Sequence, residues 1–351
     1  MEKVRVEASK DYKVIIAPKL LDQTGEYARK VCGGELAVIV TDSTLDKLYS
    51  DRVVKSLRIN GYQAITFVVE SGEKSKNALN YISLLNFMAS NGLTRTDVII
   101  ALGGGVVGDL AGFAAATYMR GMKLIQLPTT LLAAVDSSVG GKTAIDLETG
   151  KNLVGAFYQP DLVLCDYETL ETLPIEVFAD GCAEVIKYGI ISGRELFDVL
   201  KFPIKPQLEK IIAKCVSIKS SIVSKDERDS GVRQLLNLGH TIGHAVEALS
   251  EYRISHGSAV ATGLVTISRA SYKKGICSED CFKEIRSMIE HYGLPISTDF
   301  TSSEICRAAL SDKKRRGNTL NLIVPEEIGV CKIMEIEVKE LQDFIELGLK
   351  D

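Results

Sequence analysis

The fold is decided by residues 97–109, which read DVIIALGGGVVGD. A short apolar run at 98–102 leads directly into Gly103-Gly104-Gly105-Val106-Val107-Gly108-Asp109. A strand followed by G-x-G-x-x-G and a helix is typical of an α/β layer, and its glycines let a pyrophosphate approach backbone N–H groups at the helix N-terminus. The motif alone is equally compatible with a tight strand-to-helix turn that binds nothing.

Similar strand-like runs alternate with helical stretches on both sides of this segment, and several are apolar on both faces. This rhythm is typical of a parallel sheet covered by helices on each side, so we expect an N-terminal doubly wound, Rossmann-like α/β domain with its ligand crevice at the carboxyl ends of the strands. The other predicted strands are 4–8, 13–17, 36–41, 65–69, 124–127 and 162–165.

The pattern changes after Leu173-Pro174, where helical periodicities take over, as in residues 208–223. Only one late β-like pair is visible, at 320–324 and 330–333. We therefore expect a mainly α-helical C-terminal domain, with domains at 1–176 and 177–351. We place the active site in the cleft between them, where ligand sites tend to occur.

Composition excludes several classes of function. The chain has 46% hydrophobic and 25% charged residues and a formal net charge of -4, and its longest basic run is the four residues 313–316. Nucleic-acid binding needs a stronger basic field, so we expect no such partner.

No segment approaches the roughly 18 apolar residues of a membrane span, and the start has no apolar signal region, so we expect a cytosolic protein. The eight cysteines contain no C-x-x-C pair and are interpreted as reduced thiols.

Polar loops follow other predicted strands and favour a nucleotide. They are Thr41-Asp42-Ser43, whose acid could take ribose hydroxyls, and Ser71-Gly72-Glu73-Lys74. Thr129 and Thr130 follow a further strand, although such a turn is as often only a helix start.

Residues 136–143, DSSVGGKT, end like a phosphate-binding P-loop, but Asp136 stands where the first glycine is required. We therefore reject an ATPase. The segment still presents Lys142, with Lys151 and Asn152 close behind, and a lysine point charge suits a phosphate or carboxylate. A solvated loop lysine is the alternative, and it applies more readily to Lys151.

Three of the four histidines lie within seventeen residues. His240 and His244 are four apart on one helix face, and His256 precedes a glycine. This density favours a metal or catalytic site over isolated packing residues. Glu184 is the candidate carboxylate ligand, because it lies with Lys187 in the apolar stretch 182–189, where buried charges need strong partners.

Two further cations are candidates for binding a substrate carboxylate. Lys219 occupies the inward stripe of the helix at 208–223, and Arg233 precedes Asn237 by four residues. Snorkelling of Lys219 to the domain edge is the alternative.

Taken together, Gly104–Asp109, Asp136–Thr143, Lys151-Asn152, Glu184-x-x-Lys187, Asn237-x-x-His240-x-x-x-His244 and His256-Gly257 resemble the 3-dehydroquinate synthases of the shikimate pathway, over almost the whole chain. The resemblance implies a cytosolic homodimer with NAD and one divalent metal, zinc or cobalt. It also implies a small phosphorylated carboxylic-acid substrate. The reaction would convert 3-deoxy-D-arabino-heptulosonate 7-phosphate to 3-dehydroquinate and phosphate, through transient oxidation, phosphate elimination, reduction, ring opening and aldol closure.

The resemblance also implies roles for single residues. The metal ligands would be Glu184, His240 and His256, which frees His244 for substrate, whereas spacing alone favours His240 and His244 as the ligand pair. The catalytic and substrate-binding residues would be Asp136, Lys142, Asn152, Lys187, Lys219, Arg233, Asn237 and His244, with Arg120 from the neighbouring subunit and a late lysine, Lys313 or Lys314. The residues around NAD would be Asp42, Ser71, Gly72, Glu73, Lys74, Ser75, Lys76, Gly104, Gly105, Val106, Val107, Gly108, Asp109, Thr129, Thr130, Asp136, Ser137, Lys142, Lys151, Thr169, Leu170, Glu171 and Thr172.

One departure from the family pattern is Glu176-Val177, which stands where Arg-Glu is usual. Any role that the glutamate of that Arg-Glu pair has in the family is therefore not carried over to this chain.

Three alternative functions stay open. A metal- and NAD-dependent polyol or alcohol dehydrogenase would release NADH, another sugar-phosphate cyclase would use a different sugar, and a non-catalytic metal-binding protein would not bind NAD.

Overall fold

The structure is a computed structural model that describes residues 1–311 and 318–350, and these residues divide into two compact units. The first unit comprises Met1–Pro174 and Leu208–Arg228, and the second comprises Ile175–Gln207 and Asp229–Asp351. The expected division at 1–176 and 177–351 places residues 208–228 in the second domain, whereas here the chain returns to the first unit for that segment.

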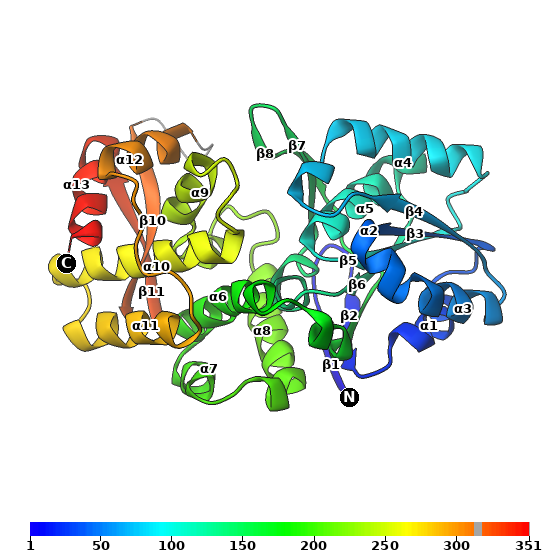
Figure 1. Ribbon diagram of the computed structural model, residues 1–351, viewed down its shortest axis with the longest axis horizontal. Coiled ribbons are helices and arrows are strands. Elements are labelled where there is room, and N and C mark those ends of the chain that lie inside the picture. Colours follow the sequence, from blue (N-terminus) through cyan, green and yellow to red (C-terminus); the bar gives the residue numbers. More distant parts are fainter. Residues whose placement is uncertain (312–317, 351) are drawn as a thin grey trace. The chain divides into compact units, whose positions relative to one another are not determined.

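A seven-stranded sheet forms the centre of the first unit, with strand order β1-β2-β9-β6-β5-β3-β4 (Figure 1). Only β1 runs antiparallel to its neighbour among these strands. Every expected strand of this half is present. The strands are β1 (Glu2–Val6), β2 (Tyr12–Ala17), β3 (Leu36–Asp42), β4 (Gln63–Val69), β5 (Val98–Gly103), β6 (Lys123–Pro128) and β9 (Leu162–Asp166).

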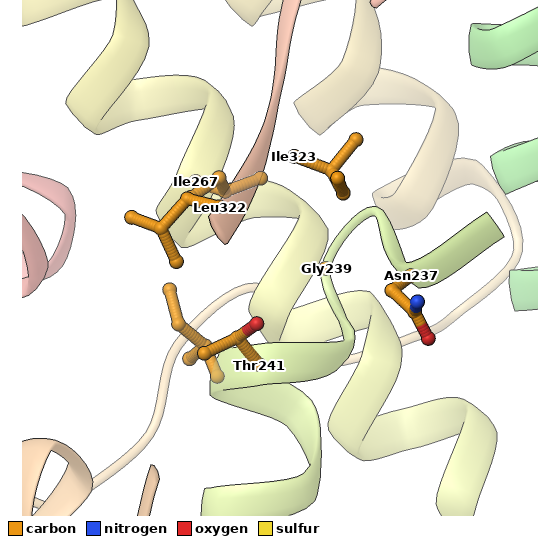
Figure 2. A pocket seen from close by; sticks show the side chains of 7 residues that line it. Asn237, Gly239, Thr241, Ile267, Leu322 and Ile323 are labelled. Carbon is orange, nitrogen blue, oxygen red and sulfur yellow. The ribbon is translucent and has the colours of Figure 1, made fainter. Parts of the chain in front are cut away.

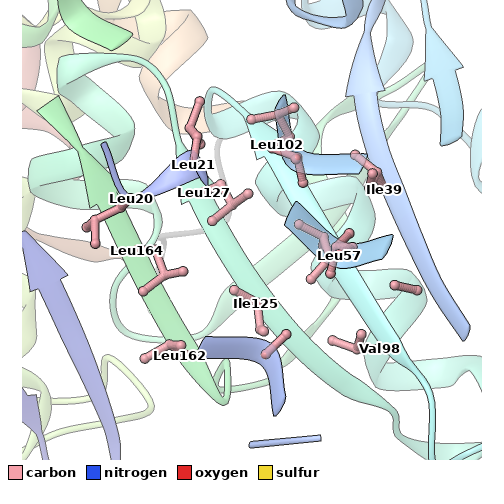
Figure 3. Packing of buried hydrophobic residues seen from close by; sticks show 14 of the residues in the cluster. Leu20, Leu21, Ile39, Leu57, Val98, Leu102, Ile125, Leu127, Leu162 and Leu164 are labelled. Carbon is pink, nitrogen blue, oxygen red and sulfur yellow. The ribbon is translucent and has the colours of Figure 1, made fainter. Parts of the chain in front are cut away.

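Both faces of this sheet are covered, because alternate side chains of one strand point to opposite sides. Ile39 and Ile100 pack into a core that includes residues of α1 and α3, whereas Val38 and Ile99 pack into a second core with α4 and α5. Figure 3 shows the first core, where leucines of neighbouring strands meet Leu57 of α3. The helices of this unit are α1 (Thr24–Val31), α2 (Ser43–Leu45), α3 (Asp51–Ile59), α4 (Ala78–Ser90), α5 (Gly105–Thr117) and α8 (Leu208–Val223).

The first unit also contains a hairpin that the sequence did not indicate. It is formed by β7 (Lys142–Leu147) and β8 (Gly150–Phe157), and it begins at Lys142, near the end of the segment 136–143 that resembles a phosphate-binding loop. Just before it, residues 133–137 form a short π-helical turn, η5 (Ala133–Ser137), that carries Asp136.

The second unit is mainly helical, as expected, with one antiparallel hairpin of β10 (Thr319–Glu327) and β11 (Val330–Glu337). None of the helices formed by the described residues is long and apolar enough to cross a membrane. The helices are α6 (Ile175–Ser192), α7 (Arg194–Phe197), α9 (His240–Leu249), α10 (His256–Lys273), α11 (Glu279–His291), α12 (Ser302–Ser311) and α13 (Val338–Leu349).

Two glycines permit close helix contacts in this unit. A Cβ at Gly257 would lie 2.0 Å from the carbonyl oxygen of Asp180 on α6, and a Cβ at Gly263 would lie 2.0 Å from the carbonyl oxygen of Gly239. Any side chain at either position would force the backbones apart. These contacts bring α6 and the start of α9 against α10, the three helices that carry Glu184, His240 and His256.

The sequence-based fold class is confirmed by these two units. The eight cysteines form no disulfide in the structure.

Candidate active site

The three residues expected to bind metal lie together in the second unit. One side-chain ligand atom from each of Glu184, His240 and His256 lies within 4.8 Å of the other two. Nε2 of His240 and Nε2 of His256 each lie 3.4 Å from Glu184 Oε1. That distance is long for a hydrogen bond, but ligand atoms about 2.1 Å from a tetrahedral zinc ion would be about 3.4 Å apart.

Glu184 is fully buried on α6 and forms an ion pair with Lys187, whose side chain is only 1% exposed. The expectation that both charges are buried is therefore confirmed. Neither oxygen of Glu184 accepts a well-aligned hydrogen bond from any described residue. A buried carboxylate with unsatisfied lone pairs is costly, so the donor set suits a cation.

The surroundings of both Nδ1 atoms suit metal binding through Nε2, because each Nδ1 faces an oxygen that can accept its proton. His240 Nδ1 lies 3.1 Å from the carbonyl oxygen of Leu238, and His256 Nδ1 lies 3.3 Å from Glu247 Oε2. A proton on each Nδ1 leaves Nε2 as a lone pair that faces Glu184. Glu247, which is 5% exposed, was missed from the sequence, because nothing in the spacing of residues links it to His256.

The charges of the cluster depend on one another. Burial alone would raise the pKa of Glu184, but Lys187 and His240 hold it well below its usual value. Burial lowers the pKa of His240 to about 4, against the opposing effect of Glu184. Burial also disfavours protonated His256, yet the nearby carboxylates of Glu184 and Glu247 outweigh it and raise that pKa to about 10. The site therefore attracts positive charge beside Glu184.

His244 belongs to the same cluster of rings but not to the ligand group. Its ring centroid lies 5.3 Å from that of His240 and 5.9 Å from that of His256. Within the described residues, the group of close ligand atoms contains His256 and not His244. Helical spacing placed His244 on the face of His240 but could not reveal that the close ligand group would not include it.

The start of α10 is fixed by Asp180 on α6. Asp180 Oδ1 accepts hydrogen bonds from Ser255 Oγ at 2.5 Å and from the Ser258 N–H at 2.8 Å. These bonds cap the helix whose first residue is His256, one turn of α6 before Glu184.

Arg233 and Asn237 lie just before α9, in the 3-10 turn η9 (Val232–Asn237). Arg233 is 2% exposed, so its charge is held inside the unit. Figure 2 shows a small pocket beside Asn237 and Gly239 that has no room for a water molecule. That pocket is part of the packing of the unit and offers no ligand volume of its own.

In the first unit, the predicted nucleotide loops gather at one edge of the sheet, because parallel strands end on the same side. β3 and β5 are neighbours whose connections leave in opposite directions, to β4 and to β6. Such a switch point is where ligands bind in open α/β sheets. The loops that meet this edge are Asp42 after β3, 71–76 after β4, 104–109 after β5, Thr129 and Thr130 after β6, and 169–172 after β9.

The glycine-rich loop after β5 is built to accept an anion. Gly104 is the N-cap of α5 and has no side chain to satisfy the first N–H groups of that helix. A Cβ at Gly105 would approach Ser137 Oγ to 3.2 Å, so a larger residue would fill this space. Nearby, Thr129 Oγ1 is buried and has no hydrogen-bond partner among the described residues. These are features of a loop that leaves polar groups for a ligand.

Several other predicted residues already have protein partners. Asp42 caps α2 by accepting hydrogen bonds from the N–H groups of Thr44 and Leu45, at 2.9 and 3.0 Å. Lys219 donates to Asp136 Oδ1 at 2.6 Å and to its carbonyl oxygen at 2.8 Å. The side chain of Lys219 thus lies inside the first unit, where it compensates the charge of Asp136.

A charge cluster links the loop after β4, helix α5 and the β7–β8 hairpin. Lys76 Nζ lies 2.9 Å from Glu73 Oε1 and 3.2 Å from Asp109 Oδ2, and Lys151 Nζ lies 3.2 Å from Glu73 Oε1. Burial raises the pKa of Asp109 to about 6, although Lys76 opposes this. Asp146 is a further member of the cluster, and it was not recognised from the sequence.

The remaining predicted residues are placed as follows. Arg120 is exposed in a left-handed conformation with φ 62°, and Lys142 begins β7. Glu176 and Val177 are exposed in the first turn of α6. Lys313 and Lys314 lie outside the described residues.

Comparisons with known proteins give consistent matches. A family model described as "3-dehydroquinate synthase N-terminal" matches residues 66–180, and one described as "3-dehydroquinate synthase C-terminal" matches 181–315. A 3-dehydroquinate synthase of Clostridium acetobutylicum is 42% identical over 341 residues, covering 95% of this chain and 96% of its own.

Solved structures with the same fold include cyclases and dehydrogenases. A 2-deoxy-scyllo-inosose synthase, solved with carbaglucose-6-phosphate, NAD+ and Co2+, superposes with a TM-score of 0.88 at 24% identity, over 99% of this chain and 100% of that one. A glycerol dehydrogenase of Schizosaccharomyces pombe gives a TM-score of 0.67 at 18% identity, over 99% of this chain and 90% of that one.

Proposed function

The chain belongs to the 3-dehydroquinate synthase family, and we propose that it catalyses the reaction of that family, the conversion of 3-deoxy-D-arabino-heptulosonate 7-phosphate to 3-dehydroquinate and phosphate. The observation that carries this proposal is the close group of Glu184, His240 and His256, of which the first two are buried, in a chain whose close relatives carry that name. The reaction class is a carbon-oxygen lyase acting on phosphate.

The metal is held by Glu184, His240 and His256 in this proposal. Support comes from the buried Glu184 oxygens, which accept no well-aligned hydrogen bond from the described residues, and from the two Nε2 atoms that lie 3.4 Å from Oε1. Zinc or cobalt, when bound, supplies Lewis-acid polarisation of substrate hydroxyls. Glu247 keeps the ring of His256 turned toward the site, and Lys187 keeps the carboxylate of Glu184 ionised.

NAD is proposed to bind at the carboxyl edge of the sheet in the first unit. When bound, it supplies reversible hydride acceptance. The uncapped N–H groups at the start of α5 would hold its pyrophosphate, and the unpartnered hydroxyl of Thr129 would donate to it or accept from it. The complex of NAD+ with 2-deoxy-scyllo-inosose synthase supports this choice of cofactor by fold.

Substrate-binding residues are proposed for each unit separately. In the first unit, Lys142 and Asn152 would contact the phosphate, Lys219 the carboxylate, and Asp136 other polar groups of the substrate. In the second unit, His244 and Asn237 would contact the phosphate and Arg233 the carboxylate. Cations fixed in the folded protein bind such anions without the entropy cost of ordering them first.

The oligomeric state and the cellular location are proposed from the same family assignment. We propose a homodimer in the cytosol in which Arg120 reaches the active site of the neighbouring subunit. The exposure of Arg120 supports this, because its side chain is available to a partner.

The decisive experiment follows phosphate release from the seven-carbon substrate in the presence of catalytic NAD, with and without a chelator. Chelator-sensitive release of phosphate without net NADH is the expected result. The rival function is that of a polyol or alcohol dehydrogenase, a class that shares the fold. Accumulation of NADH on a simple polyol, with no phosphate release, would overturn the proposal. Phosphate release from a different sugar phosphate in preference would instead indicate another cyclase.

A further inference from the structure

The β7–β8 hairpin contains an irregular step. Ile145 pairs with Val154, and Leu147 pairs with Gly150. Between these two pairs β7 has one residue, Asp146, whereas β8 has three, 151–153. β8 therefore carries two more residues than the ladder can accommodate, and this bulge contains Lys151 and Asn152. Bulges of this kind redirect side chains and are frequent beside active sites.

Backbone N–H and C=O groups in a bulge lose their hydrogen-bond partners on the opposite strand. The side chain of Asp146 provides a new partner for one of them. Its Oδ1 atom accepts a hydrogen bond from the backbone N–H of Asn152 at 2.8 Å. Asn152 adopts φ 54°, in the left-handed region that asparagine tolerates better than most residues. The carboxylate thus stabilises a backbone conformation that the hairpin ladder alone does not fix.

Asp146 is itself held in place by the loop after β4. Its backbone N–H donates to the carbonyl oxygen of Lys76 at 2.8 Å, and its Oδ1 atom lies 3.8 Å from Lys76 Nζ. Lys76 is 5% exposed and also contacts Glu73, which forms the ion pair with Lys151. Both ends of the bulge are therefore tied to the same loop, Asn152 through Asp146 and Lys151 through Glu73.

We propose that Asp146 is a positioning residue that sets the conformation of the Lys151-Asn152 bulge and so directs the Asn152 side chain toward the substrate phosphate and Lys151 toward NAD. This inference rests on the proposed function, because those two roles belong to it. The competing explanation is that Asp146 is an ordinary surface charge of a hairpin. Glu148 in the turn of the same hairpin provides the comparison, because it is exposed.

The first test measures amide hydrogen exchange of the peptides spanning residues 147–157, and needs neither substrate nor activity. Asp146→Ala should exchange faster by about tenfold or more, because it loses one charge-assisted hydrogen bond. Asp146→Asn retains an acceptor oxygen and should keep most of the protection, while Glu148→Ala should exchange like the wild type. Equal exchange in Asp146→Ala and Glu148→Ala would overturn the proposal.

The second test is a double-mutant cycle for phosphate release. Asp146→Ala should lower kcat/KM about tenfold, mainly through KM, and Asp146→Asn should restore most of it. In an Asn152→Ala background, the same change should have less than about a threefold effect on the KM of the phosphorylated substrate, because its target side chain is gone. Fully additive effects would overturn the positioning role. A wild-type protein that releases no phosphate would contradict the proposed function, and the exchange experiment would still decide whether Asp146 holds the bulge.

Discussion

Glu247 Oε2 lies 3.3 Å from Nδ1 of His256, while Nε2 of the same ring lies 3.4 Å from Glu184 Oε1. The imidazole is thus held between two carboxylates, one of which orients it and one of which shares the metal in our proposal. An outer acceptor of this kind fixes the ring and increases the basicity of the ligand nitrogen.

Glu247→Gln should therefore weaken metal binding by about 10-fold or more, without abolishing it. The amide can still accept from Nδ1 but no longer carries a charge. Metal affinity can be measured by competition with a chromophoric chelator. Glu251→Gln is the control, since Glu251 is exposed and lies just beyond α9. Equal affinities in both variants would show that Glu247 has no part in orienting His256.

Replacement of each of the two histidines of α9 should have a different effect on metal binding. His240→Asn should lose nearly all bound metal on dialysis, whereas His244→Asn should retain about one equivalent, because its nitrogens lie outside the ligand group. Metal content of the purified variants by elemental analysis provides the test. Metal loss in His244→Asn with retention in His240→Asn would favour the ligand pair expected from helical spacing.

Arg233→Met should raise the KM of the substrate about tenfold or more while leaving metal content unchanged, because it removes the buried guanidinium to which we assign the substrate carboxylate. Methionine fills much of the arginine volume, which limits the effect on packing. The thermal midpoint of the variant reports whether the second unit still folds. A large loss of metal in a protein that melts normally would count against the assignment of Arg233 to substrate.

Protonation of Asp97 should lower the free energy of unfolding in acid. Its Oδ1 atom accepts from the N–H groups of Glu35 and Leu36, and its Oδ2 atom accepts from the N–H and hydroxyl of Thr94. Burial would raise the pKa of Asp97, but these hydrogen bonds outweigh it and lower the pKa below 3.8. The folded state therefore binds the proton less tightly than the unfolded state, so this stabilisation is present above about pH 4 and is lost as pH falls through the folded pKa.

Asp97→Asn should accordingly lower the free energy of unfolding by about 2 kcal/mol at neutral pH, because an NH2 group would face the Thr94 donors. The difference from wild type should shrink as the pH is lowered toward 3. Urea unfolding at several pH values tests this, with the exposed Glu2→Gln as control. A difference that stays constant with pH would contradict the role of the charge.

Much of the first unit could be predicted because its strands are short apolar runs that end in glycine or polar loops. Strand β5 and the glycine loop after it were recognised in this way. In the second unit, the burial of Glu184 and Lys187 was predicted from the apolar stretch around them. The hairpin of β7 and β8 escaped notice because β8 is largely exposed and lacks a regular alternation. The segment 136–143 before it ends like a phosphate-binding loop, and nothing local indicated the strands that follow.

Other features depend on contacts that no local pattern contains. The period of residues 208–223 predicts a helix and its buried face, but not which core that face joins. Similarly, the spacing of His240 and His244 fixes one helix face, whereas the other histidine of the close group, His256, comes from another helix. The partnerships of Glu247 with His256 and of Asp146 with Asn152 arise only when separate segments meet in the folded chain.

The return of the chain to the first unit has a consequence for its synthesis. Helix α8, within Leu208–Arg228, packs on β1, β2 and the turn that carries Asp136, and these elements come from Met1–Pro174. A ribosome must therefore release residues up to about Arg228 from its exit tunnel before the first unit can complete its core. Until then, the apolar side of β1 and β2 needs protection from aggregation, so a nascent chain stalled near Pro174 should recruit chaperones more strongly than one stalled well beyond Arg228.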